Sequence, residues 1–260
     1  MKCVICEGEM KHAFDQKVLC KYVASYWNCS HCGYMKAADP IWLEEAYSET
    51  ITAADVGLLS RNMQFSQKIT VLIDRYLDCK GTYLDYAGGY GVFTRLMRDS
   101  GFDFLHHDIY TENLFAKEHE YKEGSDAVDG ITCFECLEHF VRPVEEIKEM
   151  LKISKNIFFS TQLKAMGVPN IEWDYYGFEH GQHVSFYSAE ALKILAKRFG
   201  LNVLSSGSLH FFTDIAIDPV EYHRLARGAG RRPHFFAKYS RCEAVVRRIR
   251  KSKKSVSKLK

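Results

Sequence analysis

Two acids and two histidines in the second half of the chain could do chemistry together. Glu135, Glu138 and His139 lie within five positions, and His183 follows in a later segment. Carboxylates and imidazoles can hold a divalent ion such as Mg²⁺ or Mn²⁺, which would lower the pKa of a bound hydroxyl. Alternatively, His139 or His183 is a general base with Glu138 beside it, because an imidazole titrates near neutral pH. In a third interpretation Glu138 and His139 only hold the following loop, and the sequence leaves the three open.

A glycine-rich turn earlier in the chain provides a second place for a ligand. Residues 83–86 form a short apolar run that predicts a buried strand, and the Ala-Gly-Gly-Tyr-Gly sequence at 87–91 cannot continue it. Apolar residues at helical spacing follow from Val92. A strand, a glycine turn and a helix are the opening of a nucleotide-binding α/β fold, in which N–H groups at the helix start can bind a ligand.

The acid at the end of this strand indicates which ligand binds. The turn lacks the last small residue of a dinucleotide site, because Thr94 stands there. Asp85, at the mouth of the turn, would repel a pyrophosphate but attract a ligand that carries an ammonium and a sulfonium. We therefore expect S-adenosylmethionine, held at Asp85, Ala87, Gly89 and Gly91.

Three more residues are expected to complete the cofactor site. Asp108 follows the strand predicted at 102–106, about 20 residues past the turn, where a carboxylate accepts both ribose hydroxyls. Tyr110 comes next and is placed to pack on the adenine. Glu135 ends the strand predicted at 128–134 and is expected to face the methyl group.

Cysteine pairs near the N-terminus form a metal-binding pattern. Cys3-x-x-Cys6 and Cys29-x-x-Cys32 each place two thiolates near one ion, and together they complete the tetrahedron of a structural zinc site. A segment this short cannot bury enough apolar surface alone, so the metal would supply its folding energy. With four ligands filled, the zinc has no open position, and we expect it to be remote from the chemistry. Cys20 is a spare thiol.

Composition bounds the class of protein and its compartment. Hydrophobic residues make up 47% of the 260 residues, which supports a sizeable core. No apolar run approaches the roughly 20 residues of a membrane span, and the N-terminus has no apolar signal-peptide core. The nine cysteines therefore indicate a reducing compartment, with thiols that bind metal or stay free. We expect a cytoplasmic protein.

Strand and helix patterns alternate along most of the chain, which predicts an α/β fold with a doubly wound, mainly parallel sheet. A helix is predicted over 55–77, and strands, besides those above, over 116–123, 157–161, 201–204 and 209–217. The expected domains are a zinc-binding module (1–38), a helical lid and linker (39–80), the sheet domain (81–218), and a C-terminal helical segment with a basic tail (219–260).

A long segment before the helix that Ser188 caps is expected to be functional, as loops of this length usually are. Residues 172–187 are rich in aromatic, Gly and His residues. We expect them to fold over the strand ends, exclude water and place His183 beside Glu138 and His139, with Glu135 in the same group. A closed pocket roofed by the aromatic side chains would favour a small acceptor, and an open basic groove would favour RNA.

These motifs together resemble those of class I S-adenosylmethionine-dependent methyltransferases. Asp85, Gly89 and Gly91 match the D-x-G-x-G-x-G pattern of their first motif, with Ala87 in place of its first glycine. The stretch FECLEHFVRPVEEI resembles their fourth motif, and the resemblance covers residues 84–206. It implies a seven-stranded Rossmann-like sheet with a small N-terminal zinc-ribbon module.

The segment WDYYGFEHGQHVSFYS narrows the resemblance and suggests an acceptor. It is similar to that of small-molecule and sugar methyltransferases, which often carry an N-terminal zinc knuckle. This implies methyl transfer to a hydroxyl of a small molecule, such as a sugar or glycan precursor. The E-x-x-E-H pattern with a distant histidine also resembles metal-dependent methyltransferases that act on small-RNA 2′-hydroxyls, which is the alternative. By itself, E-x-x-E-H occurs in ubiquinone-pathway O-methyltransferases as well.

The end of the chain is strongly basic. Residues 241–260 hold nine Lys and Arg and one acid, so they carry a net charge of +8, against −6 for the rest. Such a tail is usually solvated, although it can attract anionic membrane or nucleic acid without specificity. No aromatic residue follows Tyr239, which weakens a base-stacking role. A small acceptor is therefore the expected partner, with peripheral membrane contact or RNA as alternatives.

Overall fold

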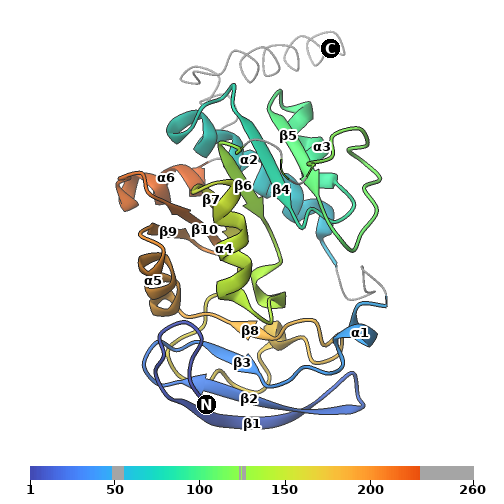
Figure 1. Ribbon diagram of the computed structural model, residues 1–260, viewed down its shortest axis with the longest axis vertical. Coiled ribbons are helices and arrows are strands. Elements are labelled where there is room, and N and C mark those ends of the chain that lie inside the picture. Colours follow the sequence, from blue (N-terminus) through green and yellow to red (C-terminus); the bar gives the residue numbers. More distant parts are fainter. Residues whose placement is uncertain (49–55, 123, 125–126, 229–260) are drawn as a thin grey trace, which may run out of the picture. The chain divides into compact units, whose positions relative to one another are not determined.

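The computed structural model describes residues 1–48, 56–122, 124 and 127–228 (Figure 1). The chain forms two compact units. The first comprises Met1–Val56, Cys133–Val203 and Gly207–Ala216, and the second Gly57–Thr132, Leu204–Ser206 and Ile217–Lys260. The N-terminal cysteines therefore share a unit with the predicted acid and histidine group, whereas the glycine turn belongs to the other unit.

A four-stranded antiparallel sheet forms part of the first unit (Figure 1). It consists, in this order, of β1 (Met10–Val18), β2 (Tyr22–Cys29), β3 (Met35–Ala37) and β8 (Ser185–Phe186). The β1–β2 hairpin turns at Leu19 and Cys20, both with positive φ. One face of the sheet packs with Trp42, Tyr176 and Val184 in a single core.

The positions of these strands have no clear signal in the sequence, for a physical reason. Only the first and last residues of β1 are buried, so the strand lacks the alternation that predicts a half-buried strand. The edge strand β8 has two residues and pairs with β3 from a distant part of the chain, with Met35 opposite Phe186 and Lys36 opposite Ser185. A pairing of this kind has no local signal.

The second sheet has six strands in the order β5-β4-β6-β7-β10-β9. Their bounds are β4 Thr82–Tyr86, β5 Asp103–His107, β6 Gly130–Cys133, β7 Ile157–Ser160, β9 Asn202–Ser206 and β10 Leu209–Thr213. β4 pairs in parallel with β5 and β6, and β7 pairs antiparallel with β10. β6, β7 and β10 are buried along their whole length, as strands covered on both faces are. The predicted fold class, an α/β Rossmann-like sheet, is confirmed.

Local signals set the ends of several helices. The helices are α1 Leu43–Ala46, α2 Leu58–Tyr76, α3 Val92–Asp99, α4 Pro143–Ile153, α5 Ala189–Arg198 and α6 Pro219–Gly228, with 3₁₀ turns η1 Leu137–His139 and η2 Asp174–Tyr176. Pro143 begins α4, where its missing N–H costs nothing. The Ser188 Oγ accepts a hydrogen bond from Ala191 N at the start of α5, which confirms the predicted cap. In the second unit, α2 packs against α3 and α6.

The strand predicted within 116–123 is reduced to a single parallel bridge between His106 and Glu120. The central sheet therefore has six strands among the described residues and not the seven expected. Asn113 explains the difference, because its side chain bonds both the N–H and the C=O of Ala116 and holds the segment in a turn.

The predicted domain boundaries at residues 38, 80 and 218 stay a prediction. The basic tail at 241–260 lies outside the described residues. None of the described helices combines the length and the apolar character that a bilayer span requires.

Candidate functional site

The glycine turn after β4 is open on one side and crowded on the other. Ala87, Gly89 and Gly91 have φ values of 55°, 56° and 83°, a conformation that favours glycine. A Cβ at Gly91 would lie 2.4 Å from Asn113 Oδ1, whereas a Cβ at Gly89 would meet nothing within 4 Å. The turn can therefore receive a ligand at Gly89, and Ala87 keeps a side chain where the family pattern has glycine.

Asp85 is buried behind this turn. Its carboxylate oxygens accept hydrogen bonds from Thr94 Oγ1 at 2.8 Å and from Thr132 Oγ1 at 2.9 Å. Burial raises the pKa of Asp85 to about 6, while the two threonine hydroxyls and His106 act in the opposite direction. Because both oxygens are engaged, Asp85 can act on a ligand through its charge rather than through a free oxygen.

Asp108 connects the end of β5 to the turn. Its Oδ2 accepts a hydrogen bond from Gly89 N at 2.9 Å, and its Oδ1 accepts from the N–H groups of Tyr110 and Thr111 at 2.8 Å each. The carboxylate therefore lies at the open side of the turn. The Tyr110 side chain is 84% exposed.

The two glycines make a matched pair for mutagenesis. Gly91→Ala should destabilise the fold by about 2 kcal/mol or more, because a new methyl group meets Asn113 and the left-handed backbone is strained. Gly89→Ala should cost only about 1 kcal/mol of stability, because only the left-handed backbone is strained. It should still weaken ligand binding, because its methyl group enters the open space where the ligand would lie. Thermal unfolding and calorimetric titration with S-adenosylmethionine would check both. Equal losses of stability in the two variants would contradict the asymmetry.

The first unit brings three of the four predicted chemical residues together. One ligand atom from each of Glu138, His139 and His183 lies within 4.8 Å of the others. Glu138 and His139 come from η1, which follows β6, and His183 comes just before β8. The ring centroids of the two histidines are 5.0 Å apart, with an interplanar angle of 84°. We call these three residues the acid–histidine cluster.

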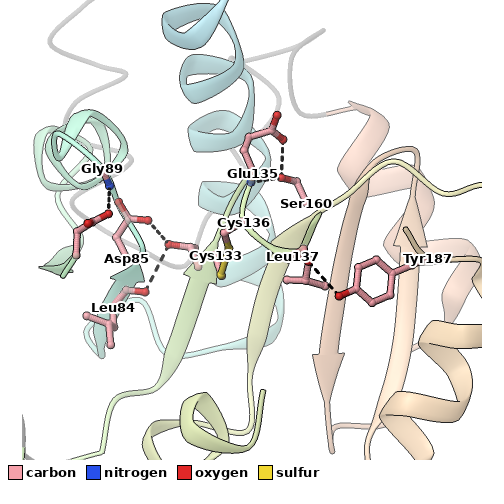
Figure 2. Close-up of a disulfide and its surroundings, with 11 residues drawn as sticks. Leu84, Asp85, Gly89, Cys133, Glu135, Cys136, Leu137, Ser160 and Tyr187 are labelled. Carbon is pink, nitrogen blue, oxygen red and sulfur yellow. Dashed lines mark hydrogen bonds between the residues drawn. A yellow bond between two sulfur atoms is a disulfide. The ribbon is translucent and has the colours of Figure 1, made fainter. Parts of the chain in front are cut away.

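Glu135 is held by a different partner. Its Oε1 accepts a hydrogen bond from Ser160 Oγ at 2.7 Å, and its N–H donates to the same oxygen at 2.7 Å (Figure 2). Its φ of 53° is left-handed, which is unusual for a side chain of this size. The carboxylate is therefore held at the end of β7. Glu135 is not among the residues whose ligand atoms lie within 4.8 Å of one another around His183.

A disulfide joins Cys133 and Cys136, the residues on either side of Phe134 and Glu135 (Figure 2). The expectation that every thiol outside the zinc pattern stays free is wrong for this pair. Residues 133–136, Cys-Phe-Glu-Cys, have a C-x-x-C spacing, and the turn out of β6 brings the two sulfurs together. Neither Cys20 nor Cys79 is part of a disulfide, and Cys20 is exposed.

Two tyrosines outside the predicted set fix the imidazoles. His183 Nδ1 donates a hydrogen bond to the Tyr175 carbonyl at 2.6 Å, and His139 Nδ1 is 2.8 Å from the Tyr47 hydroxyl. The contact of His183 leaves its Nε2 with the lone pair that a ligand needs. Tyr47 is 92 positions from His139, so the sequence offers no signal for this contact.

Burial dominates the electrostatics of the cluster. It raises the pKa of Glu138 to about 8, with the Glu135 charge as the next cause. It lowers the pKa of His183 to about 4 and that of His139 well below its usual value, and His180, whose ring lies 4.8 Å from His183, lowers both further. Imidazoles with such low pKa values are weak bases at neutral pH, but they are ready ligands because they have no proton to lose.

The aromatic side chains of the 172–187 loop mostly pack inward, which is not the roof that the sequence suggested. Tyr176 is 1% exposed and belongs to the core under the four-stranded sheet, and Phe178 packs against that core. Tyr175 is the member of the loop that reaches the cluster, since its carbonyl bonds His183 and its hydroxyl lies 3.1 Å from Thr161 Oγ1.

The four N-terminal cysteines lie together, as the sequence predicted. The Sγ atoms of Cys3 and Cys32 are 3.6 Å apart, and those of Cys6 and Cys29 are 3.5 Å apart. Sulfurs that share one tetrahedral zinc with bonds of about 2.3 Å are about 3.8 Å apart. The spacing and the donor set therefore fit a structural zinc ion, and we call these residues the four-cysteine cluster.

The four-cysteine cluster is connected to the acid–histidine cluster by a strand pair. β3 begins three residues after Cys32 and pairs with β8, which begins two residues after His183. Between them, Ala37 N donates to the Val184 carbonyl, and Val184 N donates to the Glu138 carbonyl at 2.8 Å. The expectation that the zinc ion lies remote from the chemistry stays a prediction.

Comparison with known families decides the class of protein. The sequence matches a family described as "Methyltransferase domain" over residues 60–206, which is more than half of the chain. The chain belongs to this methyltransferase family. The match confirms the enzyme class predicted from the glycine motif. No curated protein matches the sequence.

Solved structures of other methyltransferases resemble this methyltransferase weakly. CalO1, a methyltransferase in calicheamicin biosynthesis, gives a TM-score of 0.41 at 16% identity, over 68% of this chain and 60% of that chain. The plantazolicin methyltransferase BpumL gives 0.48 at 10% identity, over 73% and 87%. Human N-acetylserotonin methyltransferase gives 0.45 at 14% identity, over 68% and 66%. The methyltransferase thus spans less than two thirds of CalO1, and likenesses of this size carry no information on the acceptor.

Proposed function

We propose that this methyltransferase binds S-adenosylmethionine at the glycine turn and methylates a hydroxyl of a small molecule, such as a sugar or glycan precursor. The observation that carries the proposal is the open side of the turn at Gly89, with the Asp108 carboxylate bonded to its N–H, in a chain of the methyltransferase family. When bound, the cofactor supplies a methyl group on a positively charged sulfur.

Each cofactor-site residue has a separate task in this proposal. Asp108 would accept the ribose hydroxyls, because its carboxylate lies at the open side of the turn. Asp85 would attract the positively charged end through its buried charge, which solvent screens little. Gly89 and Gly91, together with the left-handed Ala87, keep the backbone of the turn near the ligand.

Two further residues have looser assignments. The exposed ring of Tyr110 would pack on the adenine. Glu135, held by Ser160, would border the reacting end of the cofactor.

The acid–histidine cluster would receive the acceptor. In the reaction, the acceptor oxygen gives up its proton and forms a bond to the methyl carbon, while the sulfur–carbon bond breaks and its electron pair stays on sulfur. Glu138, His139 and His183 can hold the oxygen and take part in the proton's removal. They are buried or half-buried, so water is largely kept from them.

The charges around this cluster favour a small acceptor over RNA. The charged groups that shift the pKa values of Glu138, His139 and His183 are an acid and other histidines. RNA carries a phosphate at every step, and proteins usually hold phosphates with Arg and Lys. A neutral polyhydroxy compound matches the cluster better. RNA, and membrane contact through the basic tail of a cytoplasmic enzyme, remain the alternatives.

Calorimetric titration at several pH values tests the cofactor site. Ionised Asp85 favours a cationic ligand, and with a pKa of about 6 it becomes protonated as the pH falls below that value. The affinity for S-adenosylmethionine should therefore drop about tenfold between pH 7 and pH 5. Asp85→Asn should bind more weakly at pH 7 and show a flatter pH dependence. Asp108→Ala should lose about 1 to 3 kcal/mol of binding and keep the pH dependence.

Unchanged affinity for S-adenosylmethionine in both Asp85→Asn and Asp108→Ala would contradict the cofactor assignment.

The acceptor needs a separate measurement. Incubation with S-adenosylmethionine carrying a deuterated methyl group and a mixture of nucleotide sugars, followed by mass spectrometry, should reveal a labelled product. A labelled small RNA in place of a labelled sugar would favour the alternative.

A further inference from the structure

We infer that Glu138, His139 and His183 form a binding site for one divalent transition-metal ion of the Mn²⁺, Fe²⁺ or Co²⁺ class, with coordination positions left open for the acceptor's oxygen atoms. The metal's role in catalysis rests on the proposed function, but the binding site itself does not.

The spacing of the three side chains suits a single ion. Their ligand atoms lie within 4.8 Å of one another. Ligands at bonds of about 2.1 Å are about 3.0 Å apart when adjacent and about 4.2 Å apart when opposite on an octahedral ion, so side-chain rotations that move the ligand atoms by about 1 to 2 Å close the set. Three protein ligands leave positions open on an octahedral ion, as a site that also binds substrate requires.

An unpartnered oxygen points to a ligand at this place. Glu138 is 1% exposed, and its Oε2 has no hydrogen-bond partner among the described residues. A buried carboxylate oxygen without a partner is costly, so it usually marks a bound ion or water. The charge acting most strongly on Glu138 comes from Glu135, another acid. A divalent cation would satisfy the oxygen and offset both negative charges.

Contacts of the two histidines match those of metal ligands. The hydrogen bond from His183 Nδ1 to the Tyr175 carbonyl sets its tautomer, with the lone pair on Nε2. Metal-bound histidines almost always donate their other N–H in this way. The Tyr47 hydroxyl lies 2.8 Å from Nδ1 of His139 and orients that ring. The two contacts orient the rings before any ion arrives.

The donor set also indicates which metal binds. Two imidazoles and one carboxylate suit Mn²⁺, Fe²⁺ or Co²⁺, whereas Mg²⁺ prefers oxygen ligands throughout. Glu135 would have supplied another oxygen, but Ser160 holds its carboxylate. The ligand set therefore differs from the one expected from the sequence, because it leaves out Glu135. The expected metals were Mg²⁺ and Mn²⁺, and this donor set disfavours Mg²⁺.

Mn²⁺ titration of the full chain, followed by electron paramagnetic resonance, tests the site. The protein is first treated with a mild chelator that leaves the four-cysteine cluster loaded, and thiolate ligands bind Mn²⁺ poorly. The wild type should take up one equivalent of Mn²⁺. Glu138→Gln and His183→Asn should each weaken Mn²⁺ binding by at least about 10- to 100-fold, and Tyr47→Phe, which removes only an outer contact, by about tenfold.

Matched controls come from the same loop. Glu179→Gln removes an exposed acid and His180→Gln removes the neighbouring imidazole, and neither residue belongs to the ligand group. Both variants should keep wild-type Mn²⁺ affinity. Near-ultraviolet circular dichroism confirms that each variant is folded.

Two results would overturn the inference: a folded wild type that takes up no Mn²⁺, or full Mn²⁺ affinity in both ligand variants. Calorimetry with S-adenosylmethionine on the same samples distinguishes a failure of the metal site from a failure of the proposed function. Cofactor binding and methylation without Mn²⁺ uptake would reject the metal alone, in favour of a histidine base. Mn²⁺ uptake without any cofactor affinity would reject the proposed function and leave the metal site in place.

Discussion

The double variant Cys29→Ser, Cys32→Ser is expected to lose methyl transfer completely while it still binds S-adenosylmethionine. The two serines remove half of the ligands of the four-cysteine cluster. A structural zinc ion contributes about 10 kcal/mol or more to folding, which is comparable to the whole stability of a domain. The strand pair that follows the cluster should therefore not persist without the ion.

The loss should reach the chemistry because of what β3 supports. β3 pairs with β8, and the Tyr34 hydroxyl bonds Ser185 Oγ at 2.8 Å. Ser185 Oγ in turn donates to the Phe140 carbonyl, one residue beyond η1. Without β3, neither the segment that carries His183 nor the end of η1 is held. The proposed cofactor residues of the glycine turn, together with Asp108 and Tyr110, belong to the other unit, so cofactor affinity should change by less than about threefold, or 0.7 kcal/mol.

Metal analysis, cofactor calorimetry and product formation on the same sample measure this prediction. Cys20→Ser is the matched control, because Cys20 is an exposed free thiol close in sequence to the cluster. That variant should keep its zinc and its activity. Full activity in a double variant that contains no zinc would show that the module does not position the acid–histidine cluster.

The sequence could predict the parts of the fold that rest on local signals. The apolar run before the glycine turn, Pro143 at the start of α4 and Ser188 at the start of α5 each act within a few residues. The six-stranded sheet follows from such elements, because parallel strands joined by helices have few alternative arrangements. The strand predicted at 116–123 failed because Asn113 competes for the same backbone groups, which composition does not reveal.

The part of the site that depends on contacts between residues distant in the sequence could not be predicted. The E-x-x-E-H spacing suggested that both acids point the same way, but the left-handed backbone at Glu135 turns its carboxylate to Ser160. Tyr47 reaches His139 across 92 positions, and β8 reaches β3 across the whole sheet domain. Neither contact leaves a pattern in the sequence. His183 could be proposed because its residue type matched the chemistry, although no local signal placed it.

His183→Ala is expected to lower the turnover number for the acceptor by about 10²- to 10⁴-fold, the range for removal of a group that activates a reacting oxygen. The affinity for S-adenosylmethionine should stay unchanged, because the glycine turn, Asp108 and Tyr110 lie in the other unit. The loss should appear in kcat more than in KM, since the imidazole is expected to act on the oxygen as it becomes an anion. A folding defect would instead lower the active fraction and the cofactor stoichiometry together.

His12→Ala is the control for a histidine of the same unit without a part in the chemistry. His12 is exposed on β1 and its Nε2 bonds Asp15 at 2.8 Å, so its loss should leave kcat within about twofold of wild type. His180→Gln is a stricter comparison, because its ring neighbours that of His183 without sharing the ligand group. It should lower kcat much less than His183→Ala does. Equal losses in the two loop variants would mean that the loop acts only as a support, and that His183 does not touch the acceptor or its metal.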